Sequence, residues 1–321
     1  MNMFANLRPN QLGAISAMIA VFFFSVNDGA IKFLSGGYAL HEVVLIRSVI
    51  GLVILLVLIA PLTDGFAIFR TKRLGMHLIR GFCVVMANMT FFLGLAAMPL
   101  ADAVAIFFIS PLIITVFSVV FLGEYVGPRR WAAVIVGLIG VVIMMRPGTA
   151  SFQYASLLPV VAATAYAGLH MLTRLIGRTE SAATMAVYIQ IVFIAVCVII
   201  GLAVGDGRFG DQSDPSLRFL LRAWEWPVTA DFPLFILVGF GVAIGGYFIS
   251  QAYRVAEASM VAPFEYLALP LSVLWGILVF DEWPDAVSYL GMVLILGAGL
   301  FIVWREAATA KVQLQNPRVR R

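Results

Sequence analysis

Apolar residues form ten long runs along the chain, and most of the polar stretches between them are short. A bilayer core about 30 Å thick needs roughly 20 apolar residues per spanning helix. The pattern therefore predicts ten membrane-spanning helices, at 12–34, 43–62, 76–98, 103–122, 131–146, 155–176, 184–204, 233–253, 259–280 and 286–304. Because most connections are short, consecutive helices are expected to be antiparallel.

Composition supports an all-α integral membrane protein with the bilayer as its solvent. The 321 residues are 62% hydrophobic and 12% charged, whereas soluble domains carry about 25% charged residues. A net charge of +4 is too small to indicate a nucleic-acid partner. Cys83 and Cys197 lie inside apolar runs, which does not fit a disulfide framework or a zinc site. No metal or cofactor is expected, and the first run is interpreted as a retained helix, not a signal peptide.

Lysine and arginine favour alternate connections, which predicts the orientation of the chain. With the N-terminus inside, the outer connections hold only Arg146, Arg208, Arg218 and Arg222, and most other basic residues fall inside. Cytoplasmic loops carry an excess of basic residues. Both termini are therefore expected in the cytoplasm, with 305–321 as a basic tail and the protein in the cell inner (plasma) membrane.

The one long connection, 205–232, is predicted to lie outside and to hold a short helix on the membrane surface. Asp214 is expected to be the N-cap of this helix and Pro215 its first residue. Trp224 and Trp226 are expected at the membrane interface, where tryptophan is enriched.

The two halves of the chain resemble each other, which predicts an internal repeat. Residues 98–131 and 257–289 match, with Pro111 against Pro270 and Glu124 against Glu282. Five helices in each unit, 12–146 and 155–304, would invert the second copy in the membrane. Inverted repeats are typical of alternating-access transporters, which bind substrate between the repeats near the midplane.

Three segments carry a resemblance to a known family: "EVVLIRS" (Glu42 to Ser48), "HLIRGFCVVMANMTFFLGLAAMPLADAVAIFFISPL" (His77 to Leu112) and "FLGEYVGPRRW" (Phe121 to Trp131). With them, the chain resembles the EamA family of the drug/metabolite transporter superfamily. This resemblance implies ten helices in two inverted five-helix repeats and secondary transport of a small metabolite. Bacterial relatives include carriers of riboflavin and of S-adenosylmethionine.

Asn27, Asp28 and Lys32 place polar groups inside the first apolar run. Asp28 and Lys32 are four residues apart and therefore share one helix face. Ions within a membrane face the bundle interior and find partners there. One interpretation is a self-neutralising Asp28–Lys32 pair, and the other is a gate or substrate contact at the outer end of the cavity.

Arg47 and Arg80, in the second and third predicted helices, are candidate substrate-binding residues. Arginine stays charged and binds carboxylates or phosphates through two parallel hydrogen bonds. One arginine near each mouth would receive an anionic substrate from either side. The alternatives are pairing of Arg47 with Glu42 or Asp28, and a cytoplasmic anchor at Arg80.

Prolines 111, 263 and 270 are predicted to kink the fourth and ninth helices, because proline removes a backbone hydrogen bond. Glu265 and Tyr266 lie between two of these prolines. Glu265 is a candidate for substrate binding and for proton coupling, or alternatively a partner of Arg80 or Arg254. Asn88, Tyr166, His170, Tyr247 and Tyr266 complete the predicted substrate site. Asp102 is expected to be a helix N-cap, and Gln190 and Gln251 are neighbouring polar candidates.

A secondary transporter explains these features better than a membrane-embedded transferase or a purely structural protein. The sequence contains no H-E-x-x-H, G-x-S-x-G or P-loop motif. The expected substrate is a small polar organic metabolite, anionic or zwitterionic, such as a carboxylate or a vitamin like riboflavin. S-adenosylmethionine or amino-acid carriage and metabolite export stay open, as do the coupling ion, with protons as a candidate, and the choice between monomer and homodimer.

Overall fold

The computed structural model describes residues 9–62, 65–123, 126–149, 153–176, 182–256, 261 and 264–315. Across these ranges the regular structure is entirely helical, and no β-strand occurs. Eight helical segments are long and apolar enough to cross a membrane, and two shorter apolar helices lie at Tyr154–Leu169 and Ala268–Phe280. The prediction of an all-α membrane protein is confirmed.

The first half of the chain folds into five apolar segments. These are α1 (Pro9–Leu34), α2 (Leu40–Ile54), α3 (Leu74–Ala97), the pair α4 (Leu100–Phe107) and α5 (Ser110–Leu122), and α6 (Pro128–Met145). A π-turn at Leu55–Ile59 and short 3₁₀ turns at Ala60–Leu62 and Gly65–Phe69 extend α2.

The second half follows a similar plan. A 3₁₀ turn at Tyr154–Ser156 leads into α7 (Leu157–Ile176), which is followed by α8 (Ala182–Val204), α9 (Pro215–Leu221), α10 (Phe232–Val255), α12 (Ala268–Phe280) and α13 (Ala286–Gln315). The final helix continues to Gln315, beyond the predicted end of the last span at 304, so the tail begins as an extension of α13.

The predicted fourth helix is two helices. α4 ends at Phe107 and α5 begins at Ser110, which makes Pro111 the second residue of α5. Proline has no N–H to donate, and its ring clashes with the carbonyl four residues earlier, here that of Phe107. The amide N–H of Phe108 instead closes the end of α4 by donating to the carbonyls of Val104 and Ala105.

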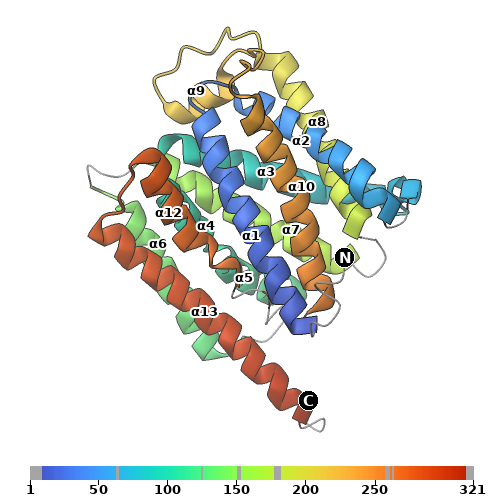
Figure 1. The fold of residues 1–321 in the computed structure, drawn as a ribbon. Coiled ribbons are helices and arrows are strands. Elements are labelled where there is room, and N and C mark those ends of the chain that lie inside the picture. Colours follow the sequence, from blue (N-terminus) through green and yellow to red (C-terminus); the bar gives the residue numbers. More distant parts are fainter. Residues whose placement is uncertain are drawn as a thin grey trace.

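Helices of the two halves interleave instead of forming separate bundles (Figure 1). α1 packs on α10 and α12, α3 packs on α7 and α8, α2 packs on α8 and α10, and α6 pairs with α13. Glycines allow some of these close approaches: a Cβ atom on Gly140 would lie 3.0 Å from the carbonyl oxygen of Gly291, and one on Gly239 would lie 2.5 Å from Cγ2 of Ile50. Small residues at helix contacts are typical of membrane bundles.

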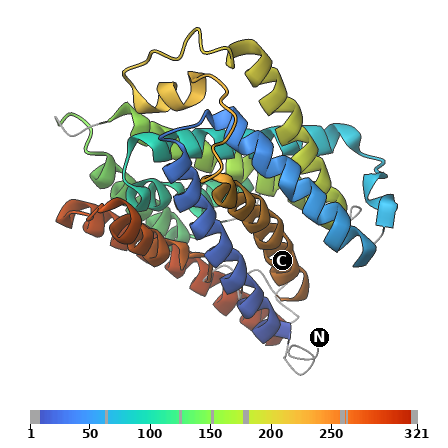
Figure 2. The same ribbon diagram turned by 45° about the horizontal axis from the view of Figure 1, so that its top comes forward.

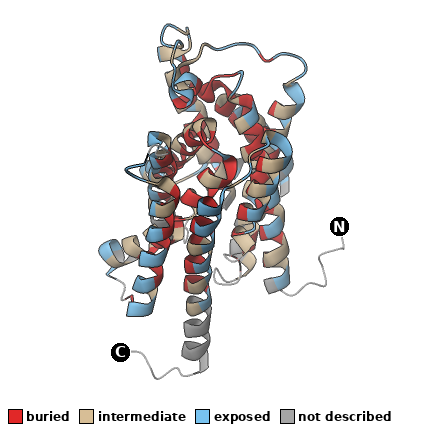
Figure 3. Ribbon diagram, turned by 90° about the vertical axis from the view of Figure 1, so that its left-hand side faces the viewer, coloured by how far each residue is buried: buried red, intermediate tan, exposed pale blue. Residues whose placement is uncertain are grey.

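Buried residues gather where the helices face one another, and exposed residues lie on the sides of the helices that face away from the bundle (Figure 3). Many exposed side chains are large and apolar; Phe22, Val120 and Leu202, for example, are 46%, 67% and 82% exposed. An apolar exterior over a packed interior fits a protein whose helices contact lipid.

The 205–232 connection and α9 lie at one end of the bundle, which we call the outer end (Figures 1 and 2). The beginning of α1 and the end of α13 lie toward the other end (Figure 1). Asp214 accepts a hydrogen bond from the backbone N–H of Leu217 at 2.9 Å, and Pro215 is the first residue of α9, so the predicted N-cap is confirmed. Ser216 fastens α9 to α3 by donating to the carbonyl of Leu93 at 2.7 Å.

Candidate functional site

Lys32 and Glu282 form an ion pair at the outer end of the bundle. The Nζ atom of Lys32 lies 2.7 Å from Oε1 of Glu282 and donates to the carbonyl of Met98 at 2.6 Å. The other Glu282 carboxylate oxygen accepts from the backbone N–H of Leu100 at 2.9 Å. This cluster, the outer closure, joins the end of α1 to the α3–α4 and α12–α13 connections. The alternative of an Asp28–Lys32 pair is therefore wrong, because Lys32 reaches a carboxylate in the other half of the chain.

Asn27 and Asp28 lie one helical turn deeper than the outer closure. Asn27 is buried and donates from Nδ2 to Oδ1 of Asp28 at 3.3 Å, while its own Oδ1 has no hydrogen-bond partner in the described part of the chain. Asp28 is half-buried. Polar groups in this position can contact a solute that has entered the bundle.

Arg47 is the most deeply buried charge of the predicted site. Its side chain lies between α2, α3 and α8, is 1% exposed, and has its guanidinium carbon 5.3 Å from the ring centre of Phe92 and 5.1 Å from that of Phe193. Neither Nε nor Nη2 has a hydrogen-bond partner among the described residues. Those two nitrogens form one edge of the guanidinium, the edge that binds a carboxylate side-on.

Among the described residues Arg47 makes no salt bridge with Glu42 or Asp28, although the Asp28 carboxylate interacts with its charge at longer range. A carboxylate oxygen of Glu42 accepts from the backbone N–H of Glu225, in the long outer connection, at 3.3 Å. Asp28 has Asn27 as its hydrogen-bonding neighbour. Aromatic rings instead cover the guanidinium of Arg47, an arrangement that stabilises the cation and leaves its edge for a ligand.

Arg80 lies near the start of α3 and is already engaged. Its Nη1 donates to the carbonyl of Met185 in α8 at 3.2 Å. One turn earlier, the imidazole of His77 stacks on Tyr188 with ring centres 4.8 Å apart. The Tyr188 hydroxyl donates to the carbonyl of Phe69 at 2.9 Å. Arg80 therefore belongs to a set of contacts that ties α3 to α8, and it does not lie beside Arg47.

Two predicted site tyrosines flank the break between α4 and α5. Tyr166 of α7 lies against Phe107, with ring centres 5.2 Å apart, and Tyr266 lies against Phe108 at 5.0 Å. Tyr266 is 4% exposed, and its hydroxyl would be 1.8 Å from a Cβ atom on Gly299 of α13. Glu265, beside it in sequence, is half-buried just before α12.

The remaining predicted residues are not brought to this region together. Tyr247 of α10 is 37% exposed beside Phe248, and Asn88 donates to the carbonyl of Val84 in its own helix. Pro270 is the third residue of α12, whereas Pro263 and the side chain of His170 lie outside the described residues.

Asp102 is not the N-cap of α4. The helix begins at Leu100, so Asp102 is its third residue. The carboxylate that binds the first backbone N–H of α4 belongs to Glu282, far away in sequence. Among the described residues, no group of three or more His, Cys, Asp or Glu side chains lies close enough to hold a metal ion.

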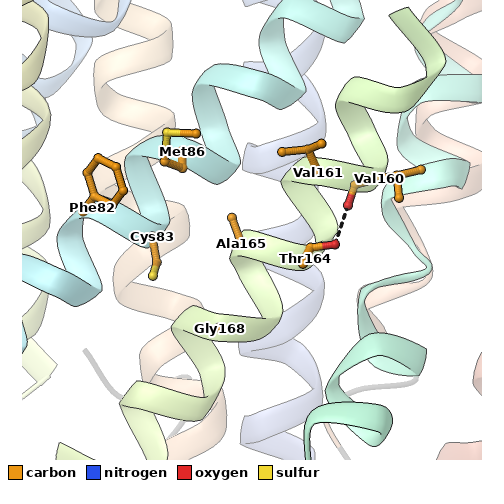
Figure 4. A pocket seen from close by; sticks show the side chains of 8 residues that line it. All are labelled: Phe82, Cys83, Met86, Val160, Val161, Thr164, Ala165 and Gly168. Atoms are coloured by element: carbon orange, nitrogen blue, oxygen red, sulfur yellow. Dashed lines mark hydrogen bonds between the residues drawn. The ribbon is translucent and has the colours of Figure 1, made fainter. Parts of the chain in front are cut away.

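A groove of about 440 Å³ runs between α3 and α7 (Figure 4). It is lined by Phe82, Cys83, Met86, Val160, Val161, Thr164, Ala165 and Gly168. The Thr164 hydroxyl donates to the carbonyl of Val160 at 2.9 Å, and Phe82 and Val161 are 56% and 45% exposed. An apolar groove on the lipid-facing side of the bundle suits lipid chains and offers no charge to a polar metabolite.

Comparison with known proteins agrees with this description. The family model described as "EamA-like transporter family" matches residues 11–146. A riboflavin transporter of Rhizobium johnstonii is 34% identical over 75% of this chain and 74% of its own length. A riboflavin transporter of Vibrio cholerae serotype O1 is 30% identical over 93% and 95%, respectively. An S-adenosylmethionine uptake transporter of Rickettsia prowazekii is 27% identical over 88% and 89%.

A solved structure titled "Crystal structure of protein" has the same fold, with a TM-score of 0.63 at 19% identity, covering 93% of this chain and 99% of the other. The structural likeness spans both halves of the chain. The alignments with the two riboflavin transporters reach 30% identity or more and cover most of each transporter's length. The chain belongs to the EamA-like transporter family.

Proposed function

We propose that this protein is a secondary transporter that carries a small polar organic metabolite across the bacterial inner membrane by alternating access. The observation that carries the proposal is Arg47, buried in the bundle with its Nε–Nη2 edge unpartnered and its faces covered by Phe92 and Phe193. A buried charge is costly without a partner. A substrate with a carboxylate or carbonyl acceptor would supply that partner.

Ten spans arranged as two inverted repeats underlie this mechanism. The five segments of each half can be matched in chain order. Each principal contact between the halves then has a counterpart in which both helices are replaced by their matched helices. The α1–α10 contact corresponds to α7–α3, and the α2–α10 contact corresponds to α8–α3. The α2–α8 and α6–α13 contacts each correspond to themselves. A pseudo-two-fold axis through the bundle explains this pattern, and it supports the internal repeat independently of residue identity.

The relatives narrow the substrate class. Riboflavin presents carbonyl oxygens on a flat heteroaromatic ring, and S-adenosylmethionine carries a carboxylate. Either group can accept two hydrogen bonds from the edge of Arg47. Phe92 and Phe193 lie against the guanidinium of Arg47 and leave that edge for the acceptor group. Riboflavin is the first candidate and S-adenosylmethionine the second. Export stays an alternative direction, because a pseudopaline exporter of Pseudomonas aeruginosa is 26% identical over 89% of this chain.

The orientation has the outer end facing the periplasm and both termini in the cytoplasm. The distribution of lysine and arginine supports it. In this orientation the outer closure bars the periplasmic side, and Glu265, half-buried near Tyr266, is the acid proposed to couple substrate movement to protons.

Uptake by purified protein in liposomes tests the function. Radiolabelled riboflavin and S-adenosylmethionine are offered separately, and the recovered solute is checked for chemical change. We expect uptake of unmodified riboflavin, with a loss of about 10- to 100-fold in Arg47→Ala, because two charge-assisted hydrogen bonds disappear. Arg47→Lys should rescue only partly, since a lysine has no fork.

The matched control is Arg208→Ala, which removes an exposed arginine paired with Asp206 at 3.4 Å in the long connection. It should transport like the wild type. Full uptake by Arg47→Ala would reject Arg47 as the substrate anchor, and a chemically altered solute would favour a membrane-embedded transferase.

A further inference from the structure

Gln190 of α8 is a second buried polar side chain with an unused hydrogen-bonding atom. It is 5% exposed, and its Oε1 has no hydrogen-bond partner in the part of the chain that the structure describes. Its amide lies against Gly51 of α2: a Cβ atom on Gly51 would be 3.3 Å from Nε2 of Gln190 and 3.1 Å from Cγ1 of Val242. The absence of a side chain at Gly51 therefore leaves the amide room between α2, α8 and α10.

Gln190 lies, to within one residue, at the position in the second half that Arg47 occupies in the first. Arg47 is the eighth residue of α2, and Gln190 is the ninth residue of α8. Arg47 contacts α3 and α8, and Gln190 lies beside α2 and α10. Under the pseudo-two-fold axis, α3 corresponds to α10 and α2 to α8, so the two environments are equivalent.

The depths of the two side chains also agree. At about 1.5 Å per residue, each lies about 10–12 Å from the start of its own helix. In the inverted repeat, α2 begins at the outer end and α8 at the opposite end. In a bilayer core about 30 Å thick, both side chains therefore lie near the middle, separated by about 7–8 Å along the bilayer normal.

The two groups have complementary chemistry. Arg47 can only donate hydrogen bonds, whereas the Oε1 atom of Gln190 can only accept them. From this geometry we infer that Gln190 is a specificity-determining residue that accepts a hydrogen bond from an N–H or O–H group of the substrate. The inference rests on the proposed function and narrows its substrate class to molecules that present both an acceptor and a donor, such as the imide edge of a flavin ring.

Stability separates this role from a structural one. If the Gln190 amide held helices together, replacing it by leucine would lower the melting temperature of the ligand-free protein. If its acceptor is kept for a ligand, leucine removes an unsatisfied polar atom from the interior. The ligand-free melting temperature of Gln190→Leu should then equal or exceed that of the wild type, while the affinity for substrate falls.

The experiment uses the purified full-length chain and two probes, riboflavin and 3-methylriboflavin, in which a methyl group replaces the imide N–H. Wild-type protein should bind riboflavin about 5- to 10-fold more tightly, the usual effect of one neutral hydrogen bond. Gln190→Leu should lose this preference, and Gln190→Glu, which keeps an acceptor, should retain part of it. Thr164→Val, in the lipid-facing groove, is the control and should bind both probes like the wild type.

A lower ligand-free melting temperature for Gln190→Leu, or an unchanged preference for riboflavin in that variant, would overturn the inference. Failure of the wild type to bind or transport riboflavin is a different result, because it rejects riboflavin as the proposed substrate. The order of the ligand-free melting temperatures still decides the role of Gln190 in that case.

Discussion

Breaking the outer closure should open the outer end of the transporter. Glu282 connects the two halves, since one carboxylate oxygen binds Lys32 of α1 and the other binds the backbone N–H of Leu100 at the start of α4. Glu282→Gln keeps the size of the side chain and its ability to accept a hydrogen bond but removes its charge. Lys32→Met removes the cation and keeps most of the apolar stem.

The size of the effect follows from burial. The side chains of Lys32 and Glu282 are 10% and 27% exposed, so water screens the pair only in part. A hydrogen bond to a charged group contributes about 1.5–3 kcal/mol when buried, and a fully exposed ion pair contributes at most about 1 kcal/mol. We therefore expect a loss of about 1–2 kcal/mol from the closed state, which raises the population of the open state by about 5- to 30-fold.

Thiol labelling measures that population. In a background where Cys83 and Cys197, both free, are replaced by alanine, a reporter cysteine is placed at Ala101, which is 2% exposed beside Leu100. A membrane-impermeant maleimide is added to intact cells. Its reaction rate should rise by about the same 5- to 30-fold in Glu282→Gln and in Lys32→Met. A cysteine at Gln212, in the long connection, is the accessible reference and should react fully if that connection is periplasmic.

The matched control is a second ion pair at the same end of the bundle. Arg146, after α6, binds Asp285, before α13, and their side chains are 26% and 53% exposed. Arg146→Ala should change the labelling rate at position 101 much less than the closure variants do, because among the described residues this pair makes no salt bridge with α1 or α4 and acts on Asp102 of α4 only through space. Equal labelling in the wild type and in both closure variants would refute the view that Lys32 and Glu282 hold the outer side shut.

Three further predictions follow from local geometry. Gly299→Ala should lower the melting temperature by several degrees and displace Tyr266, because the new Cβ would meet the tyrosine hydroxyl, whereas Gly297→Ala, with nothing within 4 Å of its Cβ position, should not. The Arg146 guanidinium lowers the pKa of Asp285 from 3.8 to about 2. The ionised Asp285 carboxylate therefore contributes fully to the free energy of unfolding above about pH 4, and this contribution disappears as the pH falls through 2. Asp285→Asn should therefore lose less melting temperature than the wild type between pH 4 and 2. Glu265→Gln should abolish uptake driven by a pH gradient but keep substrate exchange; an unchanged gradient response would exclude Glu265 and make Asp28 the next candidate.

Periodicity and composition predicted the helices well because a bilayer imposes one dominant rule on a chain. Each segment of roughly 20 apolar residues must satisfy its backbone internally and so forms a helix. The rule does not say whether a run is continuous, and the break between α4 and α5 depends on Pro111 and on the aromatic rings packed beside Phe107 and Phe108. Nor does it set the end of α13, which continues to Gln315 through residues that are no longer apolar.

The candidate site was only partly predictable, because sequence gives the chemistry of a residue and not its partner. Asp28 and Lys32 share a helix face, and spacing alone favours their pairing. The structure instead joins Lys32 to Glu282, which sequence had matched to Glu124 as a repeat position without a role. The sequence did not single out Phe92 and Phe193 as neighbours of Arg47, because phenylalanine is common in the predicted spans.

Buried polar groups in this bundle divide into two kinds, and the division has a physical reason. Lys32 and Glu282 have satisfied one another, so their burial stabilises one conformation and opposes its exchange for another. Arg47 and Gln190 have unsatisfied atoms, so their burial lowers the stability of the ligand-free protein. A substrate that hydrogen-bonds to both residues offsets this loss of stability, but only while it is bound. Binding energy is then available to offset the breaking of the outer closure, which is what a transporter needs if its substrate is to drive the change of access.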